Sequence, residues 1–267
     1  MKGIILAGGK GTRLYPLTTV TNKHLVPVGK LPMIEYPLYS LRRLGPSAIS
    51  IVTGGEHFQH LAGYFAEIHK NLEFSFHYQK AAGGIAQALS LVEHFVKEEK
   101  FAVILGDNIF EDDFIEAAKK FEESNLGVML FLKEVPDPER FGVAEIKDGK
   151  IVSIEEKPKQ PKSNYAVTGL YFYDSTVFDK IKKLKPSWRG EYELSDVNNM
   201  YVQEGRAGFH ILEGFWSDAG TFQSREKCNE FVSKFLELKV LFSLEKETRD
   251  KIVNESSFPE DIRKLLS

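Results

Sequence analysis

The feature that most constrains the fold of this chain is the alternation of strand-like and helix-like segments over its first 105 residues. Short apolar or alternating runs, typical of strands, lie at residues 3–7, 48–53, 73–78 and 101–105. Apolar residues three and four apart, typical of amphipathic helices, lie at residues 34–44, 57–69 and 85–96. Such a series predicts an α/β fold with a mostly parallel sheet and helices on both of its faces.

The second half of the chain is less regular. Asp148-Gly149, between the apolar runs 143–146 and 151–154, is a strong hairpin signal. Further strands are predicted at 167–173 and 208–212, and helices at 178–184 and 221–242. We find no internal repeat and no domain linker. Residues 1–222 are therefore predicted to form the main domain, with residues 223–267 as a helical C-terminal extension of the same domain.

Composition excludes several functional classes. The chain has 267 residues and a formal net charge of −3, which argues against a general nucleic-acid binder. Its single cysteine, Cys228, excludes an intramolecular disulfide and a multi-cysteine metal site. No segment has the composition of a signal peptide, and none approaches the roughly 20 apolar residues of a membrane helix. We therefore expect a cytoplasmic protein that binds neither nucleic acid nor membrane.

The first predicted strand ends in a glycine-rich basic turn, "GGKGTR" at residues 8–13. A P-loop requires a lysine after the last glycine, which is missing here. A dinucleotide-binding turn requires a third glycine where this chain has Leu14, and it also requires an acidic residue after the second strand. What remains is a loop of free backbone N–H groups with Arg13 and Lys23 nearby, a combination suited to binding a polyphosphate.

Two aspartates, Asp107 and Asp218, are candidate metal ligands. Asp107 comes directly after the strand 101–105, and Asp218 lies in "FWSDAGT" much further along the chain. Ligands of open parallel sheets bind beyond the carboxyl ends of the strands, and carboxylate oxygens there are typical Mg²⁺ ligands. The sequence therefore predicts that Asp107 and Asp218 share one Mg²⁺.

These residues belong to a longer pattern. The segment "GIILAGGKGTRLYPLTTVTNKHLVPV" resembles the signature of the sugar-phosphate nucleotidyltransferases. Six further motifs of that family follow in order, "GGIAQAL", "LGDNIF", "DPERFGVAEI", "EEKPKQPKSNYAVTGLYFYD", "RGEYELSDVNN" and "WSDAGT". The resemblance implies a Rossmann-like three-layer α/β/α core with an inserted sugar-binding part, and it identifies residues 1–222 as the catalytic domain. It also implies transfer of a nucleotidyl group to a sugar 1-phosphate with release of pyrophosphate.

The resemblance also implies roles for individual residues. Arg13 and Lys23 are expected to be catalytic, and Asp107 and Asp218 to bind Mg²⁺. The expected nucleotide contacts are Leu6, Gly8, Gly11, Thr12, Arg13, Gln79 and Gly84. The expected contacts to the sugar and its phosphate are Gly142, Glu156, Lys157, Val167 and Arg189. A sugar 1-phosphate is mostly dianionic at pH 7, because its second pKa is about 6, so a direct displacement without a general base is expected.

Two departures from the family pattern concern specificity. Phe141 replaces a tyrosine near the sugar, and the base loop "KAAGGI" at residues 80–85 is smaller than usual. The resemblance favours dTTP and glucose 1-phosphate as substrates, while UTP or CTP and another sugar phosphate stay open. A non-catalytic nucleotide-sugar sensor is a further alternative, although it is disfavoured by the presence of both cations and both carboxylates. A dimer or tetramer of identical chains is expected.

Overall fold

The computed structural model describes residues 1–55, 57–233 and 236–255. A central nine-stranded sheet has the main strand order β10-β9-β11-β6-β1-β4-β5, and β8 and β12 extend it beyond β11. The parallel part consists of β1 (Lys2–Ala7), β4 (Ile49–Gly54), β5 (Phe74–Gln79) and β6 (Phe101–Leu105). These four strands coincide with the predicted ones to within one or two residues, and the α/β fold with a mostly parallel core is confirmed.

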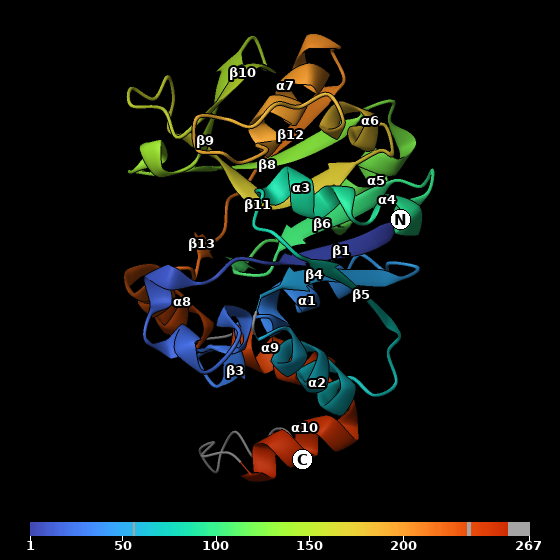
Figure 1. The fold of residues 1–267 in the computed structure, drawn as a ribbon, viewed down its shortest axis with the longest axis vertical. Coiled ribbons are helices and arrows are strands. Elements are labelled where there is room, and N and C mark those ends of the chain that lie inside the picture. Colours follow the sequence, from blue (N-terminus) through green and yellow to red (C-terminus); the bar gives the residue numbers. More distant parts are fainter. Residues whose placement is uncertain (56, 234–235, 256–267) are drawn as a thin grey trace.

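Helices cover both faces of the sheet, which gives the predicted three layers (Figure 1). On one face lie α3 (Ile85–Ser90), α4 (Glu93–Val96), α6 (Val177–Ile181) and α7 (Leu194–Gln203). On the other face lie α1 (Glu35–Arg42), α2 (Phe58–Ile68) and α5 (Ile115–Glu123). Side chains of β1 alternate between the two cores, since Ile4 packs into the first and Ile5 into the second.

The sheet becomes antiparallel beyond β6. Strand β11 (Tyr165–Tyr173) runs antiparallel to β6 and to β8 (Val128–Glu134), while β12 (Ala207–Ile211) is parallel to β8. The hairpin of β9 (Gly142–Lys147) and β10 (Lys150–Glu156) joins the other end of β11. Its turn contains Asp148 and Gly149 with positive φ, as the hairpin signal predicts.

Several elements differ from the sequence-based expectation. The helix predicted over 85–96 is divided into α3 and α4, because Leu91 and Val92 bond to carbonyls three residues back and Ser90 Oγ donates to the Gln87 carbonyl. Helices α5 and α7 and strand β8 were not anticipated. Short pairs also occur, β2 (Pro27–Val28) with β3 (Leu31–Pro32), and β7 (Asn108–Phe110) with β13 (Trp216–Asp218).

The described residues after Thr221 are mostly helical, and they pack on the N-terminal segments. Helices α8 (Phe222–Val232) and α9 (Leu236–Ser243) share a core with Leu14, Val28 and Tyr36, and α10 (Lys246–Glu255) follows. Residues 256–267 of the predicted extension lie outside the described part. Cys228 is buried in this third core, and burial raises the pKa of its thiol to about 12. Within the described residues, no helix is long and apolar enough to cross a membrane.

Candidate active site

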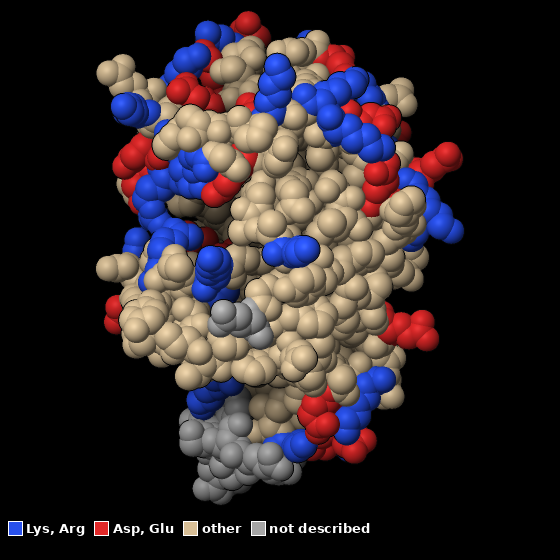
Figure 2. Space-filling model, in the orientation of Figure 1, with Lys and Arg blue, Asp and Glu red and all other residues tan. Residues whose placement is uncertain are grey.

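A cavity of about 600 Å³ lies where the parallel and antiparallel parts of the sheet meet. In the space-filling view it opens between the upper and lower parts of the molecule, with Lys and Arg side chains around it (Figure 2). Its wall contains all of the site residues predicted from the sequence except Gly11 and Thr12. These lining residues are Leu6, Gly8, Arg13, Lys23, Gln79, Gly84, Asp107, Gly142, Glu156, Lys157, Val167, Arg189 and Asp218.

Gly11 and Thr12 shape the glycine-rich loop without lining the cavity. Gly11 has φ +64, and a Cβ atom there would lie 2.8 Å from Thr18 and 2.9 Å from Lys23. A side chain at this position would therefore meet both unfavourable backbone geometry and close neighbours. Thr18 Oγ1 donates to the Gly11 carbonyl at 3.0 Å and fixes the loop from the other side. The loop thereby brings Arg13 to the cavity.

One side of the cavity is built by Gln79 and Gly84, the residues expected to contact the base. Gln79 is buried at the end of β5 and donates through Nε2 to Gln87 Oε1 at 2.7 Å, which orients its amide. A Cβ atom on Gly8 would lie 2.5 Å from Gln79 Oε1, so the first loop passes directly against this amide. Gly84 has φ +98, and a Cβ there would lie 2.7 Å from the Tyr192 carbonyl oxygen. Both glycines are thus needed for close backbone approach.

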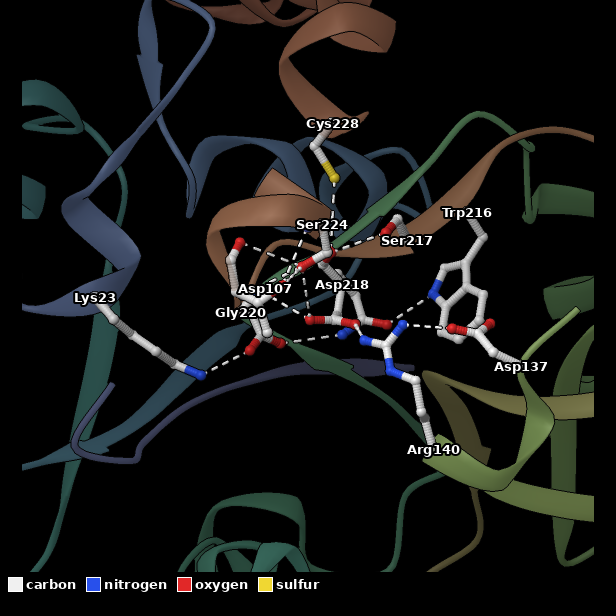
Figure 3. A network of polar contacts seen from close by, with 12 residues as sticks. Lys23, Asp107, Asp137, Arg140, Trp216, Ser217, Asp218, Gly220, Ser224 and Cys228 are labelled. Carbon is white, nitrogen blue, oxygen red and sulfur yellow. Dashed lines mark hydrogen bonds and ion pairs between the residues drawn. The ribbon is translucent and has the colours of Figure 1, made fainter. Parts of the chain in front are cut away.

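The two candidate metal ligands lie at one point of the cavity, although 111 positions separate them in the sequence (Figure 3). Asp107 lies between β6 and β7, and the pairing of β7 with β13 places Asp218 opposite Asn108. A Cβ atom on Gly220 would lie 3.0 Å from Asp218 Oδ1 and 3.4 Å from Asp107 Oδ2. The antiparallel β7–β13 pair, which the sequence did not reveal, is what unites the two carboxylates.

Asp107 forms a short ion pair with Lys23. Lys23 Nζ lies 2.6 Å from Asp107 Oδ2, and Asn108 Nδ2 donates to Asp107 Oδ1 at 3.0 Å. Burial by itself raises the pKa of Asp107, but the charge of Lys23 and these hydrogen bonds outweigh it and hold the pKa well below its usual range. The neighbouring His24 is buried, and desolvation followed by the charge of Lys23 lowers its pKa to about 3.

Asp218 has a matching arrangement with a different cation. Its Oδ1 accepts from the Gly220 backbone N–H at 2.9 Å and from Ser224 Oγ at 3.3 Å. Its Oδ2 lies 3.6 Å from Nη2 of Arg140, a residue that the sequence reasoning did not single out. Arg140 belongs to "DPERFG", so the motif contained the signal, but only the folded arrangement shows that the arginine reaches Asp218.

A second side of the cavity, where the sugar contacts are expected, is formed by three neighbouring strands. Glu156 on β10 pairs in register with Gly142 on β9, which pairs in turn with Val167 on β11. Ser195 Oγ donates to Glu156 Oε2 at 2.6 Å. A Cβ on Gly142 would lie 3.1 Å from Ser195 Oγ and 3.2 Å from Glu156 Oε2. Glu155 is exposed instead, so Glu156 is the carboxylate that faces the cavity.

Positive charge on this side comes from Arg189 and Lys157. The Arg189 guanidinium forms ion pairs with three carboxylates. Its Nη2 lies 3.1 Å from Glu191 Oε2, and its Nη1 lies 3.2 Å from Glu193 Oε1 and 3.6 Å from Glu156 Oε1. Burial, and then the charge of Glu156, raises the pKa of Glu193. Lys157 has φ +47, which is unusual for a residue with a side chain, and its N–H donates to the Phe141 carbonyl at 2.9 Å. This backbone turn directly follows Glu156.

Aromatic residues form the wall between the two sides. Trp216 Nε1 donates to Asn108 Oδ1 at 2.8 Å, and the Gly169 N–H donates to the same oxygen at 3.0 Å. The Phe141 ring lies 5.2 Å from the Trp216 ring, centroid to centroid. Trp216 is buried and its ring N–H is hydrogen-bonded, which fits a packing role, and the residue also lines the cavity.

The carboxylate pair fits a divalent cation that shares its coordination with a substrate. Asp107 and Asp218 supply the hard oxygen ligands that Mg²⁺ prefers, and their position at the strand ends is open to the cavity. Within the described residues there is no group of three or more His, Cys, Asp or Glu side chains suited to binding a metal. Two carboxylates with open positions suit Mg²⁺ bound together with phosphates rather than a closed protein cage.

Comparison with known proteins assigns the class. The model of the nucleotidyl transferase family matches residues 2–234 of this chain. The chain therefore belongs to the nucleotidyl transferase family and is an enzyme of that class. The cavity accords with this assignment, because glycine-rich backbone, paired cations and carboxylates meet in it.

Individual proteins and solved structures of this family are similar to the chain over most of its length. Glucose-1-phosphate thymidylyltransferase from Neisseria meningitidis is 44% identical over 239 residues, which cover 87% of this chain and 82% of that protein. The enzyme of the same name from Mycobacterium tuberculosis is 41% identical over 238 residues, with the same coverage. A solved Bacillus anthracis structure described by that name, with sucrose bound, is 50% identical, covers 88% of this chain and 96% of its own, and has a TM-score of 0.83. A solved structure of a UDP-glucose pyrophosphorylase with UDP-glucose bound is 25% identical. Its match covers 87% of this chain and 98% of its own, with a TM-score of 0.78.

Proposed function

We propose that this enzyme transfers the thymidylyl group of dTTP to glucose 1-phosphate, forming dTDP-glucose and pyrophosphate. The observation that carries the proposal is the division of one cavity into two chemically different sides. One side has the glycine-rich loop, Arg13, Lys23 and the carboxylate pair, and the other has Glu156 with two cations. Relatives named glucose-1-phosphate thymidylyltransferase at 41–45% identity support the choice of substrates.

On the nucleotide side, the loop of residues 8–13 donates backbone N–H groups to the triphosphate. Arg13 lines the cavity beside Gly220 and Asp218, where its charge stabilises the departing pyrophosphate. Lys23, whose Nζ lies 2.6 Å from Asp107 Oδ2, binds the phosphate that is attacked. Gln79, whose amide is oriented by Gln87, binds the base edge, and the backbone at Gly84 closes over the base.

On the sugar side, Glu156 accepts hydrogen bonds from sugar hydroxyls. Its orientation is fixed by Ser195, which donates at 2.6 Å. The backbone of Gly142 and Val167 passes beside the sugar, because the three strands are in register at these positions. Lys157 and Arg189 bind the phosphate of glucose 1-phosphate and hold it toward the nucleotide side. The protein thereby aligns an attacking and a leaving oxygen, which is its main catalytic task in this chemistry.

Asp107 and Asp218 are the residues that bind Mg²⁺ in this proposal. When bound, the ion supplies positive charge that offsets the repulsion between two phosphate groups. The attacking phosphate oxygen is already ionised near pH 7, since the second pKa of a phosphate monoester is about 6, so no residue has to remove a proton. We therefore propose a single in-line displacement without a covalent enzyme intermediate. The neutral, buried His24 is consistent with this, because it is not poised to act as a base.

UTP is the second candidate nucleotide. The UDP-glucose pyrophosphorylase with a TM-score of 0.78 favours it, since that protein has UDP-glucose bound. The base loop of residues 80–85 has mostly small side chains, and thymine differs from uracil by a single methyl group. Such a methyl contributes only about 1–3 kcal/mol to discrimination, so we expect UTP to be a slower substrate rather than an excluded one.

The experiment that tests the proposal measures pyrophosphate release from glucose 1-phosphate with dTTP, UTP, CTP, ATP and GTP separately. We expect the highest kcat/KM with dTTP and a lower value with UTP. Higher activity with UTP would correct the nucleotide and keep the reaction. Absence of pyrophosphate with all five triphosphates would contradict the proposal and favour a nucleotide-sugar sensor.

A further inference from the structure

Each of the two candidate metal carboxylates uses one oxygen for neutral donors and the other for a cation (Figure 3). In Asp107, Oδ1 accepts from Asn108 and Oδ2 lies 2.6 Å from Lys23 Nζ. In Asp218, Oδ1 accepts from Gly220 and Ser224, and Oδ2 lies 3.6 Å from Arg140 Nη2. The neutral donors fix the orientation of both carboxylates. Lys23 and Arg140 offset the negative charge on the two Oδ2 atoms.

Arg140 lies between two carboxylates and is more exposed than Lys23. Its Nη1 lies 2.6 Å from Asp137 Oδ2, and its guanidinium lies 5.2 Å from the centre of the Phe141 ring. Its side chain is 42% exposed, whereas that of Lys23 is 14% exposed. Arg140 also lines the cavity. The guanidinium thus has Asp137, Asp218 and the cavity within reach.

We propose that Lys23 and Arg140 are internal counter-ions that occupy the cation-binding oxygens of Asp107 and Asp218 until nucleotide and Mg²⁺ arrive together. This inference rests on the proposed function, since it assumes that these carboxylates bind the metal. Asp107 and Asp218 would hold Mg²⁺ through the Oδ2 atoms that Lys23 and Arg140 now face, and the two side chains would then be free to bind the phosphates of the triphosphate. Arg140 is thereby assigned as an additional phosphate-binding residue, which alternates between Asp218 and substrate.

Charge balance explains why metal and nucleotide would bind together. A divalent ion that enters alone breaks two ion pairs and leaves two cations beside it, so its binding is opposed by repulsion. The triphosphate brings several negative charges that accept the displaced side chains. Metal and nucleotide therefore favour each other's binding, and by linkage the factor is the same in both directions. The enzyme is protected from binding a divalent ion unproductively when no nucleotide is present.

The test measures binding of Mn²⁺ alone, without nucleotide, by the electron paramagnetic resonance signal of the free ion. Arg140→Met removes one counter-ion and is expected to bind Mn²⁺ about three- to tenfold more tightly than the unmodified enzyme, because a half-exposed pair is worth about 1 kcal/mol. Arg189→Met is the matched control, since it removes the same charge from the same cavity but from Glu156, Glu191 and Glu193. We expect it to leave Mn²⁺ affinity within about twofold of the unmodified enzyme.

The double variant Arg140→Met/Asp218→Asn is expected to lose the gain in Mn²⁺ affinity. Unchanged or weaker binding in Arg140→Met, an equal gain in Arg189→Met, or a gain that persists in the double variant would each overturn the proposal. Thermal melting of each variant confirms that it is folded. The measurement involves no turnover, so it fails or succeeds separately from the proposed function, which the pyrophosphate assay tests.

Discussion

The parallel and antiparallel regions of the sheet contribute to the cavity in different ways. The parallel region, strands β1, β4, β5 and β6, contributes mainly through the loops and ends that follow its strands, among them Gly8, Arg13 and Asp107. The antiparallel region, strands β9, β10 and β11, contributes from the strands themselves, through Gly142, Glu156 and Val167.

This difference follows from strand direction. All carboxyl ends of parallel strands lie at one edge of a sheet, so their loops gather there and supply backbone N–H groups and mobile side chains. Antiparallel neighbours in register present side chains and backbone in a fixed row. The parallel region is thus suited to a flexible, highly charged triphosphate. The antiparallel region is suited to a sugar of fixed shape.

Turnover should fall most when a carboxylate is removed from the parallel region. Asp107→Asn removes a charge that stabilises the bound cation, and we expect kcat to fall by about a thousandfold, equivalent to about 4 kcal/mol. Steady-state pyrophosphate release measures this. Asp113→Asn, the same change at an exposed carboxylate six residues away, is the control and is expected to keep normal turnover. Near-normal turnover of Asp107→Asn would remove the metal assignment.

A variant of Arg13 tests whether this residue acts in the chemical step or in sugar binding. Arg13→Ala removes positive charge from the departing pyrophosphate, and we expect kcat to fall by about a hundredfold, as for loss of one preorganised donor. The KM for glucose 1-phosphate should change little, because Arg13 lies on the other side of the cavity. Lys10→Ala, an exposed cation in the same loop, serves as control. If the loss appeared only in the KM for the sugar phosphate, the role given to Arg13 would be wrong.

Stability should depend on pH through His24. The unfolded chain binds a proton on this imidazole below its ordinary pKa of 6.5, whereas the folded chain does so only below about 3. Unfolding therefore takes up a proton between these values, and stability decreases as the pH falls, by up to about 2 kcal/mol from pH 7 to pH 5.

Urea denaturation of the unmodified enzyme and of His24→Gln at pH 7 and pH 5 measures the contribution of His24 to the free energy of unfolding. We expect the loss of unfolding free energy between pH 7 and pH 5 to be smaller in His24→Gln. His94→Gln, a change at an exposed histidine, should retain the full loss. An identical pH dependence in all three proteins would show that His24 is not held neutral.

The smallest effect belongs to the antiparallel side. Arg189→Met removes a cation from the sugar phosphate, and we expect the KM for glucose 1-phosphate to rise about tenfold with little change in the KM for dTTP. Steady-state kinetics with each substrate varied in turn measures both constants. Lys185→Met, an exposed residue of the same loop, should behave like the unmodified enzyme. A larger effect on dTTP than on the sugar phosphate would contradict the division of the cavity into two sides.

The same two regions differ in how well the sequence predicts them. Periodicity alone predicts the parallel strands, and the glycines before Arg13 indicate a phosphate loop, because these signals are local. The row of Glu156, Gly142 and Val167 depends on the pairing of three strands, which no local pattern encodes, so only the family resemblance indicated these residues. Arg140, Asn108 and Ser195 were missed for the same reason. Their contacts with Asp218, Trp216 and Glu156 join residues that are far apart in the sequence.

In the proposed mechanism, one cavity joins a nucleotide to a sugar phosphate in a single step. The most direct measurement is pyrophosphate release from dTTP and Mg²⁺, with and without glucose 1-phosphate. We predict no release without the sugar phosphate, and with it one pyrophosphate for each nucleotide sugar formed. Pyrophosphate released from dTTP alone, in a burst equal to the enzyme concentration, would indicate a covalent intermediate and contradict the account.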